Sequence, residues 1–373
     1  MRAKYNVLIL GASYGSLLGT KLILAGHSVT LVCTKSTAEL INNEGTFVRL
    51  PIRGRETPLE ISSKAVGADL SACTPGAADL NNYDLVVLGM QESQYGSDSI
   101  RELMERIAAS RLPCLAIMNM PPLAFLKRIP GITTDELTGC YADPGVWDRF
   151  EPGLVTLASP DPQAFRLPED GKNVLHVGLP TNFKVAPFEA DEHTAMLREI
   201  QADIEGIRYD TADGTVELPV KLKVHDSLFV PLAKWLMLLT GNYRCIKRDK
   251  MIPIKDAVHS DIDVSREIYE WVGELCLKLG ASEADLVPFD KYANAAKGLL
   301  KPSSAARALF GGAKHIERVD FLVQRIASQL GLHYPPVDEI VALVDHHLSA
   351  NNEAATLPPV DQPSSPMLDS SAP

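Results

Sequence analysis

The stretch that decides the fold is residues 5–35, YNVLILGASYGSLLGTKLILAGHSVTLVCTK. An apolar run at 7–10 ends in the turn GASYG, an amphipathic segment follows, and a second apolar run occupies 29–33. This succession predicts a strand, a tight turn, a helix and a parallel strand, the first βαβ unit of a dinucleotide-binding sheet. We therefore expect an α/β, Rossmann-like, doubly wound domain.

The glycines of this turn indicate a site for a nucleotide pyrophosphate. Gly11 allows a sharp turn, Gly15 allows backbone N–H groups to approach the phosphates, and Gly19 allows close packing of the helix. Compared with G-x-G-x-x-G the turn is one residue short, with a serine near the middle glycine. The alternative is that these glycines serve packing alone. The predicted cofactor-binding residues of the turn are Gly11, Ala12, Ser13, Tyr14, Gly15 and Ser16.

The end of the second strand bears on the choice of cofactor. A site that prefers NAD usually carries Asp or Glu there, whereas this chain has Cys33, Thr34, Lys35 and Ser36. No carboxylate would repel a 2′-phosphate, and Thr34 and Lys35 would hold one. The sequence favours NADP(H); the alternative is that Lys35 is a solvated surface lysine.

Composition restricts the classes of function. The 373 residues are 46% hydrophobic and 22% charged, as in ordinary soluble proteins, and the formal net charge of −11 argues against nucleic acid and anionic membranes as partners. No apolar run reaches the roughly 18 residues of a membrane span, and the first residues lack a cleavable signal pattern. The six cysteines form no C-x-x-C pair, so we expect neither a metal site nor a disulfide framework, and a cytoplasmic location.

Further apolar runs predict the rest of the sheet. They occupy 85–88 and 114–118, with 154–158, 174–177 and 207–210 as additional strands, and 47–50 pairs with 59–62. Ligands of open parallel sheets lie beyond the strand C-termini, so Gly89, Met90, Gln91 and Glu92 should face the cofactor. The next strand ends in Asn119.

Helical periodicity dominates from residue 226 onward, at 228–240, 264–279, 305–310, 319–330 and 337–348. We therefore predict a dinucleotide-binding domain over 1–222, an all-α substrate and catalytic domain over 223–350, and a disordered Pro- and Ser-rich tail over 351–373.

Lys234 is the most informative position of the helical part. Residues 228–239 are otherwise apolar on every face, so the pattern predicts a core helix that contains one ammonium group. Burying an ammonium costs several kcal/mol unless it is paired or deprotonated, and in a cleft it would serve as a general acid or base. The alternative is a lysine that reaches water at the helix end.

These motifs together resemble the ketopantoate reductase (2-dehydropantoate 2-reductase) family of the 6-phosphogluconate-dehydrogenase-like superfamily, as a divergent member. The resemblance covers about residues 5–345 and rests on GASYGSLLG with AGHSVTLV, on AIMNMPP, on the lysine helix, and on PSSAARALFGGAKHIERVD with GLHYPPVDEI. It implies the α/β domain followed by the all-α domain.

The resemblance also implies a role for each matching residue. Lys234 is placed as the proton donor to the alkoxide that forms when hydride reaches a 2-keto carbon. Asn119 contacts the nicotinamide ribose, Asn242 binds substrate, and Ser304 and Glu317 hold the carboxylate and hydroxyl of the substrate. Each has a structural alternative, such as helix capping by Asn242 or Ser304.

Some positions depart from the family pattern. Leu238 replaces a second asparagine, Gly89 or Met90 replaces a lysine, and Thr34 replaces an arginine. An alternative alignment puts His315 in the place of Glu317. Because polar contacts are lost, ketopantoate is a doubtful substrate, and a larger, more apolar one is expected.

The sequence thus predicts an NADPH-dependent reductase of a 2-keto acid or related carbonyl. The alternatives are an imine- or opine-type dehydrogenase on the same scaffold and a non-catalytic protein that senses NADP(H). The partner is a small carbonyl compound, and apolar helices of the second domain are compatible with a homodimer.

Overall fold

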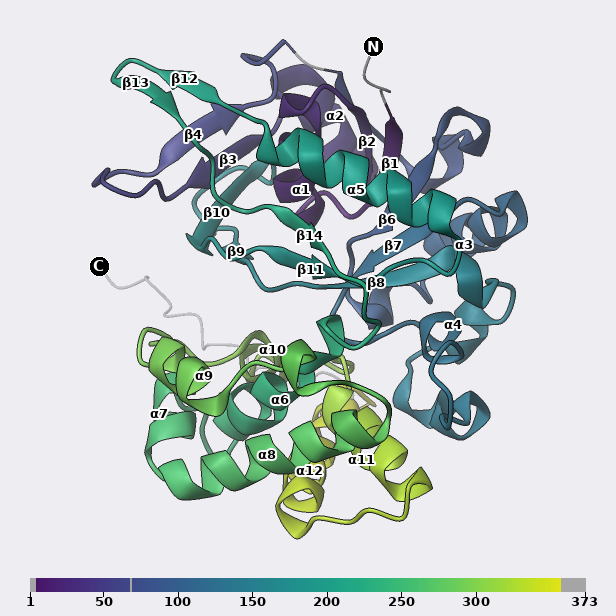
Figure 1. Ribbon diagram of the computed structural model, residues 1–373, viewed down its shortest axis with the longest axis vertical. Coiled ribbons are helices and arrows are strands. Elements are labelled where there is room, and N and C mark those ends of the chain that lie inside the picture. The colour runs from purple at the N-terminus through teal and green to yellow at the C-terminus, as the bar shows by residue number, and fades with distance from the viewer. Residues whose placement is uncertain (1–4, 68, 357–373) are drawn as a thin grey trace, which may run out of the picture.

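The computed structural model describes residues 5–67 and 69–356. An α/β part forms the upper half of the view in Figure 1, and a helical part lies below it. Every named strand of the described chain ends before residue 225, and helices make up the regular structure from residue 231 onward.

The centre of the α/β part is an eight-stranded sheet in the order β14-β11-β8-β7-β6-β1-β2-β5. The six strands from β8 to β5 are parallel, so their C-terminal ends share one edge. β11 runs antiparallel to β8. The strands of this sheet are β1 (Asn6–Leu10), β2 (Ser28–Val32), β5 (Leu70–Cys73), β6 (Leu85–Leu88), β7 (Cys114–Ile117), β8 (Val155–Ser159), β11 (Phe183–Val185) and β14 (Leu222–Val224).

The two faces of this sheet are buried against different elements. Along β1, Val7 and Ile9 face one apolar core while Leu8 and Leu10 face another, as the two-residue period of a strand requires. The first core is covered by α1 (Tyr14–Leu24) and α5 (Asp191–Glu205), which crosses the front in Figure 1. The second lies under α3 (Asp98–Ser110) and α4 (Leu123–Leu126) and continues into the helical part. The two parts therefore share one apolar core.

Smaller additions flank the main sheet. β3 (Phe47–Leu50) and β4 (Leu59–Ser62) form the predicted antiparallel pair, and β10 (Val174–Leu179) and β9 (Gln163–Phe165) extend it to four strands. β12 (Tyr209–Thr211) and β13 (Gly214–Val216) form a separate hairpin, and α2 (Lys35–Glu44) follows β2. The sequence indicated neither α2 nor α5.

The helical part is built around the lysine segment. This segment is not one α-helix: 3₁₀ turns at Pro231–Ala233 and Tyr243–Cys245 enclose α6 (Lys234–Met237) and a π-helical turn (Leu238–Asn242). The prediction of a continuous helix over 228–240 was therefore wrong. Around it pack α7 (Ile254–His259), α8 (Ile262–Lys278), α9 (Phe289–Ala296), α10 (Ser304–Phe310), α11 (Val319–Gln329) and α12 (Pro335–Thr356).

The fold class predicted from the sequence is confirmed: a doubly wound α/β part precedes an all-α part. The predicted tail begins too early, because α12 continues through Thr356; residues 357–373 lie outside the described residues. The domain limit at 222 stays a prediction, and β14 extends to Val224. Among the described residues, no helix has both the length and the apolarity to span a membrane.

Candidate active site

The glycine turn lies at the edge where the parallel strands end. Gly11 has φ of +100°, and a Cβ there would lie 2.8 Å from Met90 Cγ, so no other residue fits without strain. Gly15 is different: its Cβ would lie 2.7 Å from Cγ2 of Ile9, on the strand side of α1. The lack of a side chain at Gly15 therefore lets α1 pack closely on β1, and its expected role toward a phosphate stays a prediction.

The other residues of the turn differ in whether their side chains are exposed or buried. Ser13 is exposed, whereas Ala12 and Ser16 are buried. The hydroxyl of Ser16 donates to the carbonyl of Ala12, so it points inward rather than toward a ligand. The hydroxyl of Tyr14 donates to the carbonyl of Pro162, which fixes the chain after β8 beside the turn. The first N–H groups of α1, which lack intrahelical acceptors, are those available to a phosphate.

The end of β2 is open to solvent. Thr34 is the N-terminal flanking residue of α2 and its hydroxyl donates to Oγ1 of Thr37 at 3.0 Å. Lys35 begins the helix, and both Thr34 and Lys35 are exposed. Hydroxyl, ammonium and helix N-terminus are thus placed together where a ribose phosphate would lie.

One pocket brings together predicted residues from both parts of the chain. Gln91 and Asn119 come from the strand ends, and Asn242, Ser304 and Glu317 come from the helical part. Its free space is about 40 Å³, enough for a few water molecules but far below the roughly 300–1,000 Å³ of typical ligand sites. A keto acid would therefore fit this pocket only if its lining side chains moved.

A larger hollow, of about 400 Å³, lies between α8 and α9 and includes Arg266 and Asn294. It is remote from the sheet edge and contains none of the predicted residues. We assign the candidate site to the smaller pocket because the strand ends and the helical part meet there.

Glu317 connects the two parts at this pocket. The amide of Asn119 donates to Oε2 of Glu317 at 3.1 Å. Burial raises the pKa of Glu317, and this hydrogen bond, with the N–H groups of Glu92, Met120 and Asn119, acts in the opposite direction. His315, the alternative residue, is exposed and does not line the pocket. The geometry thus favours Glu317 over His315.

A second carboxyl group lies beside Glu317. Glu92 is 3% exposed, and its carboxylate accepts a hydrogen bond from the N–H of Ala142 at 3.1 Å. Burial raises the pKa of Glu92 to about 7; the Ala142 N–H lowers it and the charge of Glu317 raises it further. Two ionised carboxylates here would repel the carboxylate of a keto acid, but the raised pKa values of Glu92 and Glu317 favour their neutral forms, which can contact it.

The π-helical turn shapes the helical side of the pocket. Gly241 within it is buried, and a Cβ there would lie 2.1 Å from the hydroxyl of Tyr292. Leu238 and Asn242 line the pocket from this turn. The carbonyl of Asn242 accepts a hydrogen bond from Ser303 Oγ at 2.6 Å, and Ser303, not Ser304, caps α10.

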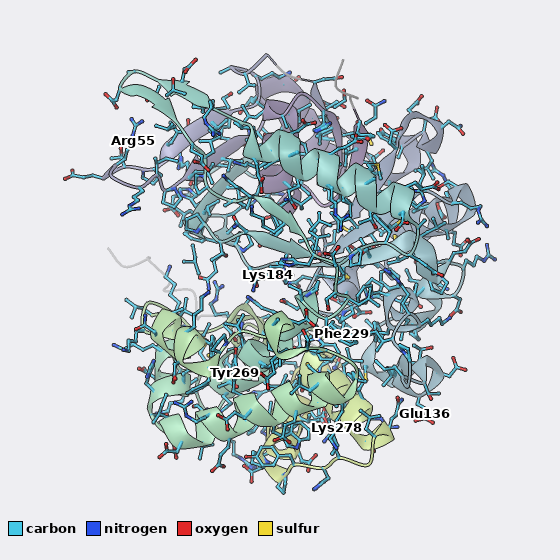
Figure 2. The ribbon with its side chains drawn as sticks, viewed as in Figure 1. Arg55, Glu136, Lys184, Phe229, Tyr269 and Lys278 are labelled. Atoms are coloured by element: carbon cyan, nitrogen blue, oxygen red, sulfur yellow. The ribbon has the colours of Figure 1, made fainter. Side chains whose placement is uncertain are left out.

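Lys234 lies one helical turn before Leu238 and forms an ion pair across the two parts. Its Nζ is 2.9 Å from Oδ1 of Asp161, and Nζ of Lys184 is 3.4 Å from Oδ2. Figure 2 shows Lys184 where the two parts meet. Burial opposes ionisation of Asp161, but the two ammonium groups outweigh it and hold its pKa below the ordinary value. Lys234 is 20% exposed, so it is a paired, half-buried lysine at the sheet edge rather than a core residue.

Sequence reasoning expected Glu92 at the cofactor edge of the sheet, but it identified neither Asp161 nor Arg166. Asp161 follows the C-terminal end of β8 by two residues, so the rule that indicated Gln91 would also have indicated Asp161. Arg166 follows β9, and its Nη2 donates to the carbonyl of Ala12 at 3.1 Å. No local sequence pattern predicts this contact between Arg166 and Ala12.

These features fit a bound dinucleotide. The turn at Gly11 needs glycine, the end of β2 has no acid, and the buried Nε of Arg166 has no hydrogen-bond partner in the described part of the chain. A metal does not share this support: residues 5–67 and 69–356 hold no cluster of three or more His, Cys, Asp or Glu side chains suited to one.

Comparison with solved structures identifies the fold. D-mandelate dehydrogenase in a ternary structure with NADH and anilino(oxo)acetate has a TM-score of 0.62 at 14% identity, over 93% of this chain and 99% of that one. The chain has the ketopantoate reductase fold. The 2-dehydropantoate 2-reductase of Methylococcus capsulatus has a TM-score of 0.64 at 14% identity, over 93% and 97% of the two chains.

The dimeric ketopantoate reductase of Staphylococcus aureus has a TM-score of 0.56 at 12% identity, over 93% of this chain and 99% of that one. No protein-family model and no curated protein matches the chain. The resemblance inferred from the motifs is thus confirmed for the fold, while the low identities leave activity to be argued from the site.

Proposed function

We propose that the protein is an NADPH-dependent reductase of a 2-keto acid or a related carbonyl compound. The observation that carries the proposal is Lys234, whose ammonium is held at the C-terminal edge of the sheet by Asp161. This is the edge at which ligands of parallel sheets bind, and the fold is that of enzymes named as ketopantoate reductases and D-mandelate dehydrogenase. A homodimer in the cytoplasm completes the proposal.

The chain's own residues divide the work as follows. NADPH, when bound, supplies the hydride that reduces the carbonyl carbon. Lys234 donates a proton to the resulting alkoxide oxygen, and Asp161 keeps the ammonium oriented before the transfer. The released amine regains its proton from water. The step adds one hydride and one proton to the carbonyl and yields an alcohol.

Asn119 and Asn242 orient the reactants from opposite sides of the pocket. Ser304 and Glu317 contact the polar end of the substrate. Because Leu238 lines the same pocket, part of the pocket wall that would contact the substrate is apolar. This favours a keto acid with an apolar side chain over ketopantoate.

The test replaces Lys234 by methionine and measures NADPH oxidation with a panel of 2-keto acids. Lys278→Met, at an exposed position of α8, is the matched control. We expect Lys234→Met to retain NADPH binding and to lose about 10²- to 10⁴-fold in kcat/KM, the usual contribution of a positioned general acid. Undiminished turnover in this variant would contradict the mechanism.

A second candidate is a non-catalytic protein that senses NADP(H). The narrow pocket, in which Glu317 already bonds to Asn119, favours it. Tight NADPH binding without turnover of any 2-keto acid, with or without an added amine, would support the sensor. Consumption of NADPH only when an amine is present would instead support an imine- or opine-type dehydrogenase.

A further inference from the structure

Arg166 brings a positive charge to the glycine turn from a distant part of the chain. It follows β9, and its Nη2 donates to the carbonyl of Ala12 at 3.1 Å. The hydrogen bond from Tyr14 to the carbonyl of Pro162 fixes the same segment at a second point. The guanidinium is therefore held beside the turn and is not free to sample solvent.

The guanidinium lacks a counter-ion among the described residues. No carboxylate of residues 5–67 or 69–356 forms an ion pair with Arg166, and its Nε is buried without a hydrogen-bond partner. Burial lowers the pKa of Arg166, which reflects the cost of the unpaired charge. A partly buried guanidinium with spare donors is a site for an anion.

The position of Arg166 indicates which anion. The guanidinium lies near the Cys33 thiol, at the end of β2. β1 and β2 are paired, and the N–H of Gly11 donates to the carbonyl of Val32 at 2.9 Å, so the turn and the end of β2 are adjacent. Arg166 thus lies where a dinucleotide-binding sheet places the adenine ribose.

We propose that Arg166 binds the 2′-phosphate of NADP(H) and sets the preference over NAD(H). The inference rests on the proposed function for the presence of the dinucleotide. Thr34 and Lys35 lie exposed at the start of α2, so the phosphate would be held between a planar guanidinium on one side and a hydroxyl, an ammonium and a helix N-terminus on the other. Because the end of β2 carries no Asp or Glu, no carboxylate there would repel the negative charge of the phosphate.

The experiment titrates the full chain with NADPH and with NADH, following nicotinamide fluorescence. Arg166→Gln should weaken NADPH binding by about 10- to 100-fold, the range for a hydrogen bond to a charged group, and should change NADH binding by less than about threefold. Arg248→Gln, at an exposed position of the helical part, is the control and should change neither.

Other outcomes are equally defined. Equal weakening of NADPH and NADH would assign Arg166 to the shared pyrophosphate or to folding and would overturn the proposal. Equal binding of both cofactors by the unmodified chain would also overturn it. If the unmodified chain binds neither NADPH nor NADH, the proposed function fails together with the role of Arg166. Failure of the Arg166 proposal alone is therefore distinguishable from failure of the proposed function.

A second measurement covers the case in which Arg166→Gln does not fold. Arg166→Lys keeps the charge but loses the planar fork. Adenosine 2′,5′-bisphosphate should raise the Tm of the unmodified protein more than AMP does, and Arg166→Lys should lose most of that difference. An unchanged difference would overturn the proposal.

Discussion

Replacing Lys21 by methionine should remove a pH dependence from the stability of the protein. Lys21 lies in α1 and is 1% exposed. Its Nζ donates to the carbonyl of Pro219 at 2.9 Å and lies 3.5 Å from the carbonyl of Leu218. Burial lowers the pKa of Lys21 to about 7; the charge of Lys221 lowers it further and that of Glu217 raises it.

The magnitude follows from the difference between the folded and unfolded pKa values. The unfolded chain titrates at 10.5 and the folded chain at about 7, so the unfolded state binds more protons throughout this window and stability rises with pH. Between pH 7 and pH 9 the unfolded lysine keeps its proton while the folded lysine releases it. The free energy of unfolding should gain about 2 kcal/mol from this one group.

Urea denaturation across that pH range measures the effect. Methionine keeps the length of the side chain and the helix propensity but cannot titrate. The stability difference between the unmodified chain and Lys21→Met should change by about 2 kcal/mol between pH 7 and pH 9, and Lys278→Met, at an exposed site, should follow the unmodified chain. A difference that stays constant with pH would show that Lys21 reaches solvent, and would refute the reasoning.

Three further predictions concern residues that support the pocket or the ion pair of Lys234. Glu92 has its folded pKa raised from 4.5 to about 7, so its contribution is present at low pH and is lost as pH rises; Glu92→Gln should remove a loss of about 2 kcal/mol between pH 5 and pH 7, measured by urea denaturation. Gly241→Ala places a Cβ 2.1 Å from the hydroxyl of Tyr292 and should destabilise the fold by about 1–3 kcal/mol in the same assay; Gly298→Ala, whose Cβ would meet nothing closer than 3.6 Å, is the control. Asp161→Asn removes the counter-ion of Lys234 and should lower kcat while NADPH binding is retained; an unchanged kcat would contradict the assigned positioning role.

Much of the α/β part could be predicted because its signals are local. Buried parallel strands appear as short apolar runs, and β1, β6 and β7 match the predicted strands within one residue. The rule that ligands lie beyond the strand C-termini indicated Gln91, and the family resemblance indicated Asn119; both line the pocket. α5 was missed although it covers a face of the sheet and carries Met196, Leu197, Ile200 and Ile204 at helical spacing.

The lysine argument shows where local reasoning fails. Lys234 has only apolar neighbours in sequence, yet its ammonium leaves the helix and pairs with Asp161. Lys21 lies in a less distinctive helix and is the more buried of the two. The difference comes from what packs on each helix: α1 is covered by the segment at Leu218 and Pro219, which supplies two carbonyl groups. Burial of a side chain depends on such distant segments, and the helix sequence does not report them.

The segment between β8 and β10 also acts through contacts with residues distant in sequence, and it matters most for function. Within seven residues it supplies Asp161 to Lys234, the carbonyl of Pro162 to Tyr14, and Arg166 to the carbonyl of Ala12. These contacts span 73, 148 and 154 residues, so no periodic pattern encodes them. Because one segment contacts both the proposed proton donor and the proposed cofactor turn, a substitution that displaces it should weaken NADPH binding and turnover together. Lys234→Met should instead separate the two, and that contrast tells a disordered site from a missing proton donor.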